Sequence, residues 1–349
     1  MKLNNAAKLF GIQRFSTCKE WILTISKDNI CLNNNFLLQE SEYNTAFFVG
    51  DKYVLYGNIN HFFKYNLETN VIEKLNAEWS YYQNWFNSNS ILISLNRRKD
   101  EKNNRIADYH YFDFSSNILS KKIFTDSPQI KILENNGIIC SNNLFLKSIS
   151  LLTGEYKWEV DLSPSYPTAQ IHEIIGVYKN VLLVSLNEGT LLGLDTEKGV
   201  ILWEMPYQAA LKVRFNRGIH LDTEKGLLYC LSGNGFAVIA LVNQQVIRSK
   251  NDYYVYTEEI TEPYQYGYSD AGSAFGLSCW QGDYLYFTAS KGTAFYGWLG
   301  VFHIPTMEVV WEYQIQNGET FNSPPQVSEN KLYVLDTGGT LHIFERENE

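Results

Sequence analysis

Cysteine is scarce in this sequence of 349 residues and is never clustered. The five cysteines are Cys18, Cys31, Cys140, Cys230 and Cys279, and no two of them form a close pair. Secreted scaffolds that depend on disulfides tend to use even, paired sets of cysteines. An odd and scattered set argues against a disulfide framework and predicts buried, free thiols in a reducing compartment.

Long hydrophobic runs are also missing. The first ten residues, Met1 to Phe10, contain no apolar stretch long enough for the core of a secretory signal. No later stretch is long enough to span a bilayer. We therefore expect a cytoplasmic protein that does not use a membrane as its partner.

The spacings that usually hold metals, phosphates or catalytic nucleophiles are absent. The six histidines, His61, His110, His172, His220, His303 and His342, lie in different parts of the chain. No His-x-His, His-Glu-x-x-His or Cys-x-x-Cys spacing occurs, and the turn at 232–235 lacks the Lys-Ser/Thr of a phosphate loop. No nucleophile has a base at a usable spacing. The sequence predicts no catalytic residue, no cofactor and no metal site.

Positive charge is in the minority. Lys and Arg number 29 against 38 Asp and Glu, which gives a net charge of −9 at pH 7. A chain with this balance does not favour the phosphate backbone of a nucleic acid, whereas it attracts basic surfaces. The composition therefore predicts a basic protein as the partner and no nucleic acid.

Helical periodicity is almost absent, and a repeat of short alternating strands takes its place. Hydrophobic residues make up 45% of the chain and aromatic residues 15%, and aromatic side chains pack well on pleated sheets. The segment 150–158 is echoed by 193–203, so that Trp158 and Trp203 lie 45 residues apart. A repeat of this length, built from short strands and tight turns, is typical of a β-propeller blade.

Eight similar strands begin at intervals that fit such blades. They are Ile22–Ser26, Val54–Asn58, Ile91–Asn96, Ile138–Asn142, Leu182–Asn187, Leu228–Gly233, Leu285–Ser290 and Leu332–Thr337. Each ends in residues that start turns. We predict an all-β propeller of eight blades that forms a single domain over residues 1–349. Seven blades with an irregular N-terminal portion is the alternative, because the first interval is short.

The last repeat stops at 344–349 without a final hydrophobic strand. A propeller avoids an exposed sheet edge by completing its last blade with a strand from the other end of the chain. The segment around Lys8–Ile12 is the natural donor. We therefore expect closure by the N-terminal strand and an ordered N-terminus.

The best-preserved repeat runs from Gly189 to Glu204 and reads Gly-Thr-Leu-Leu-Gly-Leu-Asp-Thr-Glu-Lys-Gly-Val-Ile-Leu-Trp-Glu. It resembles the repeat of the pyrroloquinoline-quinone-type (quinoprotein-like) propellers, in which Gly-x-Leu-x-x-Leu-Asp-x-x-x-Gly-x-x-x-Trp recurs once per blade. The resemblance implies that each such Trp packs between neighbouring blades. The dehydrogenases of this family are much longer, secreted and loaded with quinone and Ca²⁺. The resemblance therefore points to the non-enzymatic branch, whose members bind proteins.

The repeated residues also have a physical role of their own. Asp195 is suited to accept hydrogen bonds from turn amides, and Gly199 supplies a positive φ. The tryptophans Trp158, Trp203 and Trp311 offer large planar surfaces between sheets. We expect all three to be buried and structural.

Two insertions stand apart from the repeat. The segment Arg97–Arg105 holds five basic and two acidic residues between two strands, and we predict a protruding hairpin tip there. The segment 252–270 holds six tyrosines and five carboxylates with no basic residue. Tyrosine is enriched at protein interfaces, and interspersed carboxylates steer a basic partner.

The sequence thus predicts a non-catalytic protein-binding propeller, of a bacterial immunity-type or regulatory kind, that binds a basic protein. Its predicted partner-binding residues are Tyr253, Tyr254, Tyr256, Glu258, Glu259, Glu262, Tyr264, Tyr266, Tyr268 and Asp270. The same tyrosines could instead cover the outer edge of a blade. The alternative function is an enzyme or a carbohydrate-binding lectin that uses an aromatic axial funnel, with Trp85, Trp280 and Trp298 as stacking platforms.

Overall fold

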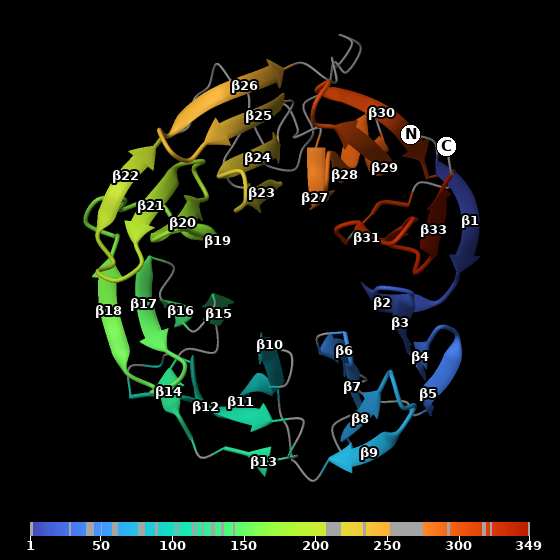
Figure 1. The fold of residues 1–349 in the computed structure, drawn as a ribbon, viewed down its shortest axis with the longest axis horizontal. Coiled ribbons are helices and arrows are strands. Elements are labelled where there is room, and N and C mark those ends of the chain that lie inside the picture. Colours follow the sequence, from blue (N-terminus) through green and yellow to red (C-terminus); the bar gives the residue numbers. More distant parts are fainter. Residues whose placement is uncertain are drawn as a thin grey trace. The chain divides into compact units, whose positions relative to one another are not determined.

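The computed structural model describes most of the chain. The described residues are 3–27, 29–39, 45–49, 51–57, 62–75, 81–87, 90–101, 103, 105–113, 116, 118–120, 122–126, 130–133, 136–141, 144–206, 218–232, 235–251, 275–291, 294–315, 319–321 and 323–347. All elements in these ranges are β-strands, and no helix in them could cross a bilayer. The strands form eight sheets, one after another along the chain (Figure 1).

The first four blades follow the order of the sequence. Blade one holds β2 (Ile12–Cys18), β3 (Trp21–Ser26), β4 (Asn29–Leu32) and β5 (Asn35–Gln39). Blade two holds β6 (Thr45–Val49), β7 (Tyr53–Gly57), β8 (Phe62–Asn66) and β9 (Ile72–Leu75). Blade three holds β10 (Tyr81–Asn87), β11 (Ser90–Lys99) and β12 (Arg105–Asp113), and its last position is split into β13 (Ile118–Leu119) and β14 (Phe124–Asp126). Blade four holds β15 (Ile130–Leu133), β16 (Asn136–Ser141), β17 (Phe145–Ser150) and β18 (Tyr156–Asp161).

The remaining blades repeat the pattern. Blade five holds β19 (Ile171–Tyr178), β20 (Val181–Leu186), β21 (Leu191–Asp195) and β22 (Ile201–Met205). Blade six holds β23 (Ile219–Asp222), β24 (Leu227–Ser232), β25 (Gly235–Ala240) and β26 (Gln245–Asn251). Blade seven holds β27 (Phe275–Gln281), β28 (Tyr284–Lys291), β29 (Ala294–His303) and β30 (Glu308–Gln314). Blade eight holds β31 (Gln326–Ser328), β32 (Lys331–Leu335), β33 (Leu341–Arg346) and β1 (Leu3–Leu9).

The fold is therefore an all-β propeller with eight blades, as predicted, and the seven-bladed alternative is wrong. Each of the eight strands predicted to start a repeat is the second strand of its blade. Each of these strands contains buried apolar residues at its centre, which is why the pattern revealed them first.

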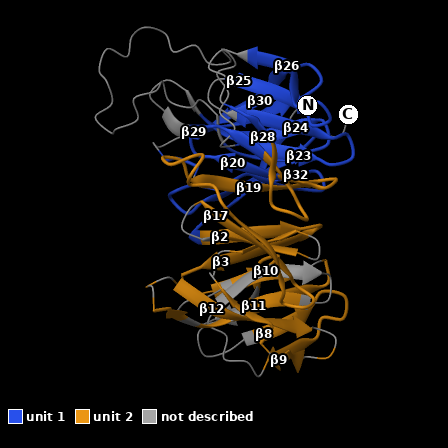
Figure 2. Cartoon of the chain, turned by 90° about the vertical axis from the view of Figure 1, so that its left-hand side faces the viewer, with its two compact units in different colours: residues 1–12, 183–192, 203–349 blue, residues 13–182, 193–202 orange. Residues whose placement is uncertain are grey.

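The described chain divides into two compact units (Figure 2). Unit 1 comprises Met1–Ile12, Leu183–Leu192 and Trp203–Glu349, and unit 2 comprises Gln13–Leu182 and Gly193–Leu202. In unit 1, Phe236, Phe287 and Phe302 are fully buried in one cluster from blades six and seven. In unit 2, Tyr109 and Ile139 are fully buried in a cluster from blades three and four. The prediction of a single domain over residues 1–349 stays a prediction.

Closure by the N-terminal strand is confirmed. In Figure 1, β1 lies beside β33, and the two strands pair antiparallel from Leu3 opposite Arg346 to Leu9 opposite Leu341. The donor strand lies earlier than the predicted segment Lys8–Ile12, because Gly11 turns the chain with a φ of 74° and Ile12 already begins β2. The edge of the last blade is thus covered by backbone pairing.

The turn chemistry predicted for the best-preserved repeat is confirmed. The Asp195 carboxylate accepts the backbone N–H groups of Glu197 and Lys198, both at 2.8 Å. Gly199 has a φ of 69°, and its missing Cβ makes room for the indole of Trp158, whose Cε3 would lie 2.6 Å from that atom. The Trp158 Nε1–H donates to the carbonyl oxygen of Thr196 at 2.7 Å. A turn of blade five therefore holds the tryptophan of blade four.

The other two repeat tryptophans are less enclosed than predicted. Trp158 is buried, whereas Trp203 and Trp311 are only half-buried. Trp311 packs edge-on against Phe344 of β33, with 5.3 Å between the ring centroids. The fourth strand of blade eight comes from the N-terminus, so blade eight has no turn between third and fourth strands like the one that covers Trp158.

Strand direction gives each blade a loop-bearing end. Neighbouring strands of a blade run in opposite directions. The turn between the second and third strands of a blade therefore lies at the same end of the blade as the last residue of the fourth strand. The first strand also begins at this end. We call it the loop-bearing end, because it carries the connections between blades and both predicted insertions.

Candidate protein-binding site

The ten predicted partner-binding residues, from Tyr253 to Asp270, all lie outside the described residues, so their role stays a prediction. The described strands nevertheless fix where this segment starts and ends. It follows Asn251, the last residue of β26 in blade six, and precedes Phe275, the first residue of β27 in blade seven. Both points lie at the loop-bearing ends of their blades.

The length of this connection sets it apart. It contains 23 residues, whereas the other seven connections between blades contain between two and 13. Most connections in compact domains are short, and long ones are disproportionately functional. The extra residues are not needed to join two blades, and we therefore treat the connection as an insertion on a rigid support.

An exposed aromatic residue lies at the loop-bearing end of blade eight. Phe10 follows β1 and is 74% exposed. The backbone N–H of Ile12 donates to the carbonyl oxygen of Gly339 at 2.8 Å, which fixes this segment to the turn between β32 and β33. From the sequence, Phe10 was expected only as part of the closing strand, and no role at the surface was predicted for it.

A buried carboxylate–histidine pair supports the same turn. His342 Nε2 lies 2.8 Å from Asp336 Oδ2, and Asp336 Oδ1 accepts the Thr340 backbone N–H at 2.8 Å. Burial lowers the pKa of His342 and outweighs the opposite effect of Asp336. The ring is therefore neutral at pH 7 and donates through Nε2. The geometry is that of a structural clamp for the turn.

Two carboxylates approach the backbone of this turn. The Thr337 hydroxyl donates to Glu319 Oε2, and the Thr337 backbone N–H donates to the Thr320 carbonyl at 2.8 Å. A Cβ at Gly338 would lie 3.1 Å from Glu319 Cδ and 3.3 Å from Asp336 Oδ1. Because residue 338 is glycine, the turn can pass close to both acids. The two carboxylates add negative charge to the loop-bearing end of blade eight.

One serine–histidine pair forms across two blades. His220 Nε2 of β23 lies 2.8 Å from Ser278 Oγ of β27. Burial lowers the pKa of His220 to about 4, so the ring is a weak base at neutral pH. No carboxylate among the described residues hydrogen-bonds this ring, which a nucleophile–base pair needs for orientation. The pair joins the first strand of blade six to the first strand of blade seven.

The aromatic residues of the alternative function are occupied by packing. Trp280 and Trp298 are half-buried and pack against the core cluster of blades six and seven. The Trp280 Nε1–H donates to the Gly282 carbonyl at 2.7 Å, and its ring contacts Tyr229. The side chain of Trp85 lies outside the described residues. Both described tryptophans thus take part in the packing of unit 1, and the alternative function stays a prediction.

The basic insertion is a hairpin, as predicted. Strands β11 and β12 pair antiparallel up to Lys99 opposite Arg105, and a bulge between Leu95 and Arg98 interrupts the register. Asn96 within the bulge has a φ of 50°. The hairpin brings Arg98, Lys99 and Arg105 to the loop-bearing end of blade three.

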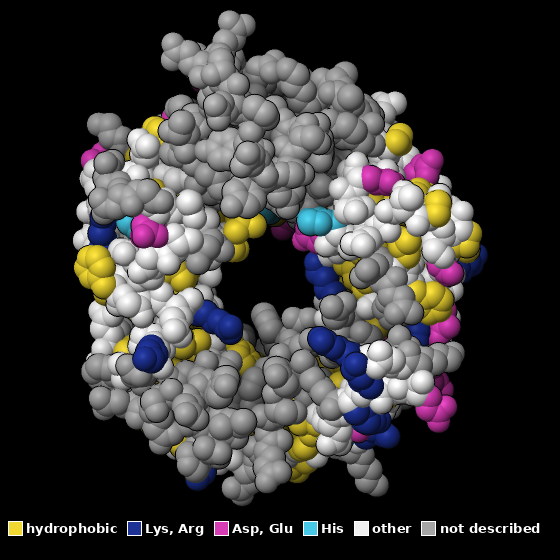
Figure 3. Space-filling model, turned by 180° about the vertical axis from the view of Figure 1, so that it is seen from behind, with side chains coloured by type: hydrophobic (Ala, Val, Ile, Leu, Met, Phe, Trp, Pro, Cys, Tyr) yellow, Lys and Arg dark blue, Asp and Glu magenta, His cyan; other side chains and the backbone are white. Residues whose placement is uncertain are grey.

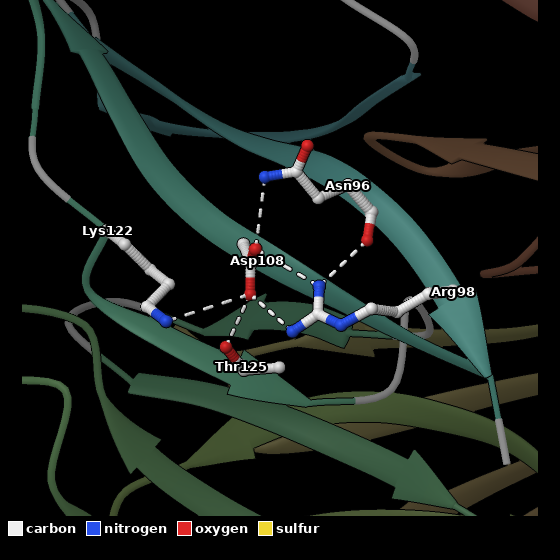
Figure 4. A network of polar contacts seen from close by, with 5 residues as sticks. All are labelled: Asn96, Arg98, Asp108, Lys122 and Thr125. Carbon is white, nitrogen blue, oxygen red and sulfur yellow. Dashed lines mark hydrogen bonds and ion pairs between the residues drawn. The ribbon is translucent and has the colours of Figure 1, made fainter. Parts of the chain in front are cut away.

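A polar network anchors this hairpin (Figure 4). The Arg98 guanidinium donates to both oxygens of the Asp108 carboxylate, at 3.0 and 3.1 Å. Thr125 Oγ1 donates to Asp108 Oδ1 at 2.6 Å, and Asn96 Nδ2 donates to Asp108 Oδ2 at 3.1 Å. Lys122 Nζ lies 4.0 Å from Asp108 Oδ1. Burial raises the pKa of Asp108, but the hydrogen bonds outweigh it and hold the pKa well below its usual range. The carboxylate joins the hairpin to β14.

Replacing Asp108 by Asn is expected to lower the free energy of unfolding at pH 7 by about 1–3 kcal/mol. The figure is at the modest end for a buried carboxylate because the Arg98 side chain is 45% exposed and water replaces part of the contact. The pKa is depressed in the folded state, so the stabilisation is complete above the unfolded pKa of about 3.9 and is lost as the pH falls below it.

Urea denaturation at pH 7 and at pH 3 measures this effect. The stability gap between the parent and Asp108→Asn should be smaller at pH 3. Glu101→Gln, an exposed change near the tip of the same hairpin, should leave stability unchanged at both values. Equal stability of Asp108→Asn and the parent at pH 7 would contradict the anchoring role.

The described surface carries both signs of charge. On the face drawn in Figure 3, basic and acidic side chains are both present. Among the described residues, no group of three or more His, Cys, Asp or Glu side chains is placed to hold a metal ion. None of the five cysteines forms a disulfide; Cys230 is buried as predicted, and the other four are only half-buried. Burial raises the pKa of Cys279 to about 12, so this thiol is protonated at neutral pH.

Comparison with known proteins shows the fold. No family model and no curated protein sequence matches the chain. The C-terminal WD40 domain of Sif2 has a TM-score of 0.62 at 10% identity and covers 99% of both chains. Sqt1 from Saccharomyces cerevisiae has a TM-score of 0.61 at 10% identity over the whole of both chains. BamB from Moraxella catarrhalis, a quinoprotein-like propeller, has a TM-score of 0.58 at 10% identity and covers 100% of this chain and 99% of its own. The chain is similar to these propellers in fold.

Proposed function

We propose that this propeller is a non-catalytic module that binds another protein through the loop-bearing end of blades six to eight. The observation that carries the proposal is the 23-residue connection between Asn251 and Phe275, rich in tyrosine and carboxylate, on a rigid pair of blades. The exposed Phe10 and the acid Glu319 lie at the same kind of end in blade eight. The propellers of similar fold are protein-interaction scaffolds.

The finer form of the proposal names the partner as a basic protein. The net charge of −9 and the five carboxylates of the connection supply the attraction. We further propose a cytoplasmic, bacterial immunity-type or regulatory binder related to the non-enzymatic quinoprotein-like propellers. The repeat Gly189–Glu204 and its Trp158–Gly199 packing support that relation.

Reversing Glu258, Glu259 and Glu262 to Lys is expected to slow association with the partner about tenfold and to weaken its salt dependence, because steering charges act on the encounter rate. The partner is captured from a lysate of the source cells with the parent chain, purified, and used in association measurements at two salt concentrations. The melting temperature should not change, since an inserted loop adds little to a blade core.

A matched control carries the same change of charge at the opposite ends of blades six, seven and eight. Glu224, Glu308 and Glu329 are exposed there, and their reversal to Lys should leave the association rate within about twofold of the parent. Equal slowing in both triple variants would assign the effect to net charge. Parent-like rates in the first variant would place the interface elsewhere.

A further inference from the structure

Blade five has an open outer edge that begins with three consecutive exposed aliphatic residues. Strand β22 is the last strand of its sheet, and in the described part of the chain no strand pairs with its outer side (Figure 1). Val200, Ile201 and Leu202 are 51%, 38% and 51% exposed. Neighbouring residues of a strand point to opposite faces of the sheet, so apolar surface is exposed on both sides of this edge. Such an edge is a template for pairing with another strand.

The corresponding edges of three other blades begin with a protecting residue. In blades four to seven, the turn before the fourth strand contains a residue with a positive φ, and these residues are Gly154, Gly199, Gln244 and Met307. In blades four, six and seven the next residue is exposed and polar or charged, namely Glu155, Gln245 and Glu308. Blade five has Val200 in this place. Since charged and polar residues keep sheet edges from pairing, blade five is the least protected of these four blades.

The backbone of this edge is oriented for pairing at Ile201. The Val200 carbonyl oxygen accepts the Asp195 N–H at 2.9 Å, so it points toward β21. Successive residues of a strand direct their backbone groups to opposite edges. The N–H and C=O groups of Ile201 therefore point outward. An antiparallel strand centred there would exchange two hydrogen bonds with this residue.

The sequence of the edge is complementary to itself when two copies run antiparallel. We take the register in which Ile201 of one copy lies opposite Ile201 of the other. Val200 then lies opposite Leu202, and Lys198 in the turn lies near Glu204 of the other copy. Both of these contacts occur twice, as a two-fold axis requires. The side chains of Lys198 and Glu204 are exposed, and opposite charges across a strand pair are favourable.

We infer that the edge Lys198–Glu204 is a docking surface for a second copy of this chain, and that two copies join there by antiparallel pairing of β22. Each chain has one such edge, and the contact uses it in both copies, so association stops at a dimer. The edge is short, and contacts that bury little area are weak. The dimer should be populated at about 100 µM and dissociate at about 1 µM. The surface differs from the tyrosine-rich connection in sequence and in partner, so either can fail without the other.

Sedimentation velocity tests the proposal at chain concentrations from about 1 to 200 µM and at about 150 mM NaCl. The parent should change from monomer to dimer over this range. Ile201→Lys should weaken dimerisation about tenfold or more, because two lysines then face each other at the two-fold axis. Val310→Lys is the matched control, since this residue is 37% exposed on the fourth strand of blade seven. It should dimerise like the parent, and both variants should keep the parent melting temperature in dilute solution.

Charge reversal tests the antiparallel register. Lys198→Glu and Glu204→Lys should each weaken dimerisation about threefold to tenfold, since each brings like charges together twice. The double variant restores opposite charges and should dimerise like the parent. An equimolar mixture of the two single variants should form heterodimers that are tighter than either homodimer, because every contact between the chains is then of opposite sign. Native mass spectrometry distinguishes these species when one variant is enriched in nitrogen-15.

Three results would overturn the proposal. The first is a parent that stays monomeric at about 200 µM, and the second is an Ile201→Lys variant that dimerises like the parent. The third is a parent that forms assemblies larger than a dimer which Ile201→Lys abolishes, since β22 would then be an unprotected edge without a two-fold contact. The antiparallel register is wrong if the mixture of single charge variants forms no heterodimer in excess of the homodimers.

Discussion

Replacing Trp158 by alanine is expected to lower the free energy of unfolding by about 3–5 kcal/mol. The indole is only 7% exposed and fills the space above Gly199, where any Cβ would collide with it. Its N–H also satisfies the Thr196 carbonyl at 2.7 Å. Alanine would therefore leave a cavity and an unpaired carbonyl at the contact between two blades.

Equilibrium unfolding in urea, followed by circular dichroism, measures the loss. Trp203→Ala is the matched control, because this tryptophan occupies the equivalent place in the next repeat but is half-buried, and its replacement should cost less. Trp158→Phe should keep most of the ring contact and lose about 1 kcal/mol for the missing hydrogen bond. A loss below about 1 kcal/mol in Trp158→Ala would show that the indole does not hold the two blades together.

Features that depend on neighbours in the chain were predictable from the sequence. The turn around Asp195 is made by residues within four positions of one another, and each has the side chain that its place requires. The second strand of each blade is a run of apolar residues that ends in a turn former, so all eight could be located. Because one such strand occurs in each repeat, the number of these strands predicted the number of blades.

The closing strand was harder to place for a physical reason. Of the residues in β1, only Leu3 is buried, and those from Asn4 to Lys8 are all exposed. A strand at the outer edge of a sheet is held by backbone hydrogen bonds, and it needs no alternation of apolar and polar side chains. The more apolar stretch at Leu9–Ile12 therefore drew the prediction a few residues too far along the chain.

The polar contacts of the sites depend on register and could not be predicted in this way. Asp108 meets Arg98 and Thr125 because β11 and β14 pair with opposite edges of β12. His220 and Ser278 lie 58 residues apart and meet only because blades six and seven pack together. One signal was available: Asp108 is the only carboxylate in the stretch 106–112, which implies a buried partner, since a buried carboxylate needs hydrogen bonds.

Deleting Met1–Leu9 is expected to lower the melting temperature by about 5 °C or more. The deletion removes the pairing of β1 with β33, and it removes Leu3 from a cluster that contains Leu332 and Phe344. It also exposes the edge of β33, which promotes association between chains. Thermal unfolding followed by circular dichroism measures the first effect, and size-exclusion chromatography measures the second.

Two further measurements separate the closing strand from its side chains. Replacing Asn5 and Lys8, which are exposed in β1, by alanine should leave the melting temperature within about 1 °C, because backbone pairing is kept. A synthetic peptide of residues 1–9, added to the truncated chain, should restore part of the lost stability, since it binds the folded edge and not the unfolded chain. A truncated chain that melts like the parent and stays monomeric would show that blade eight does not need its fourth strand.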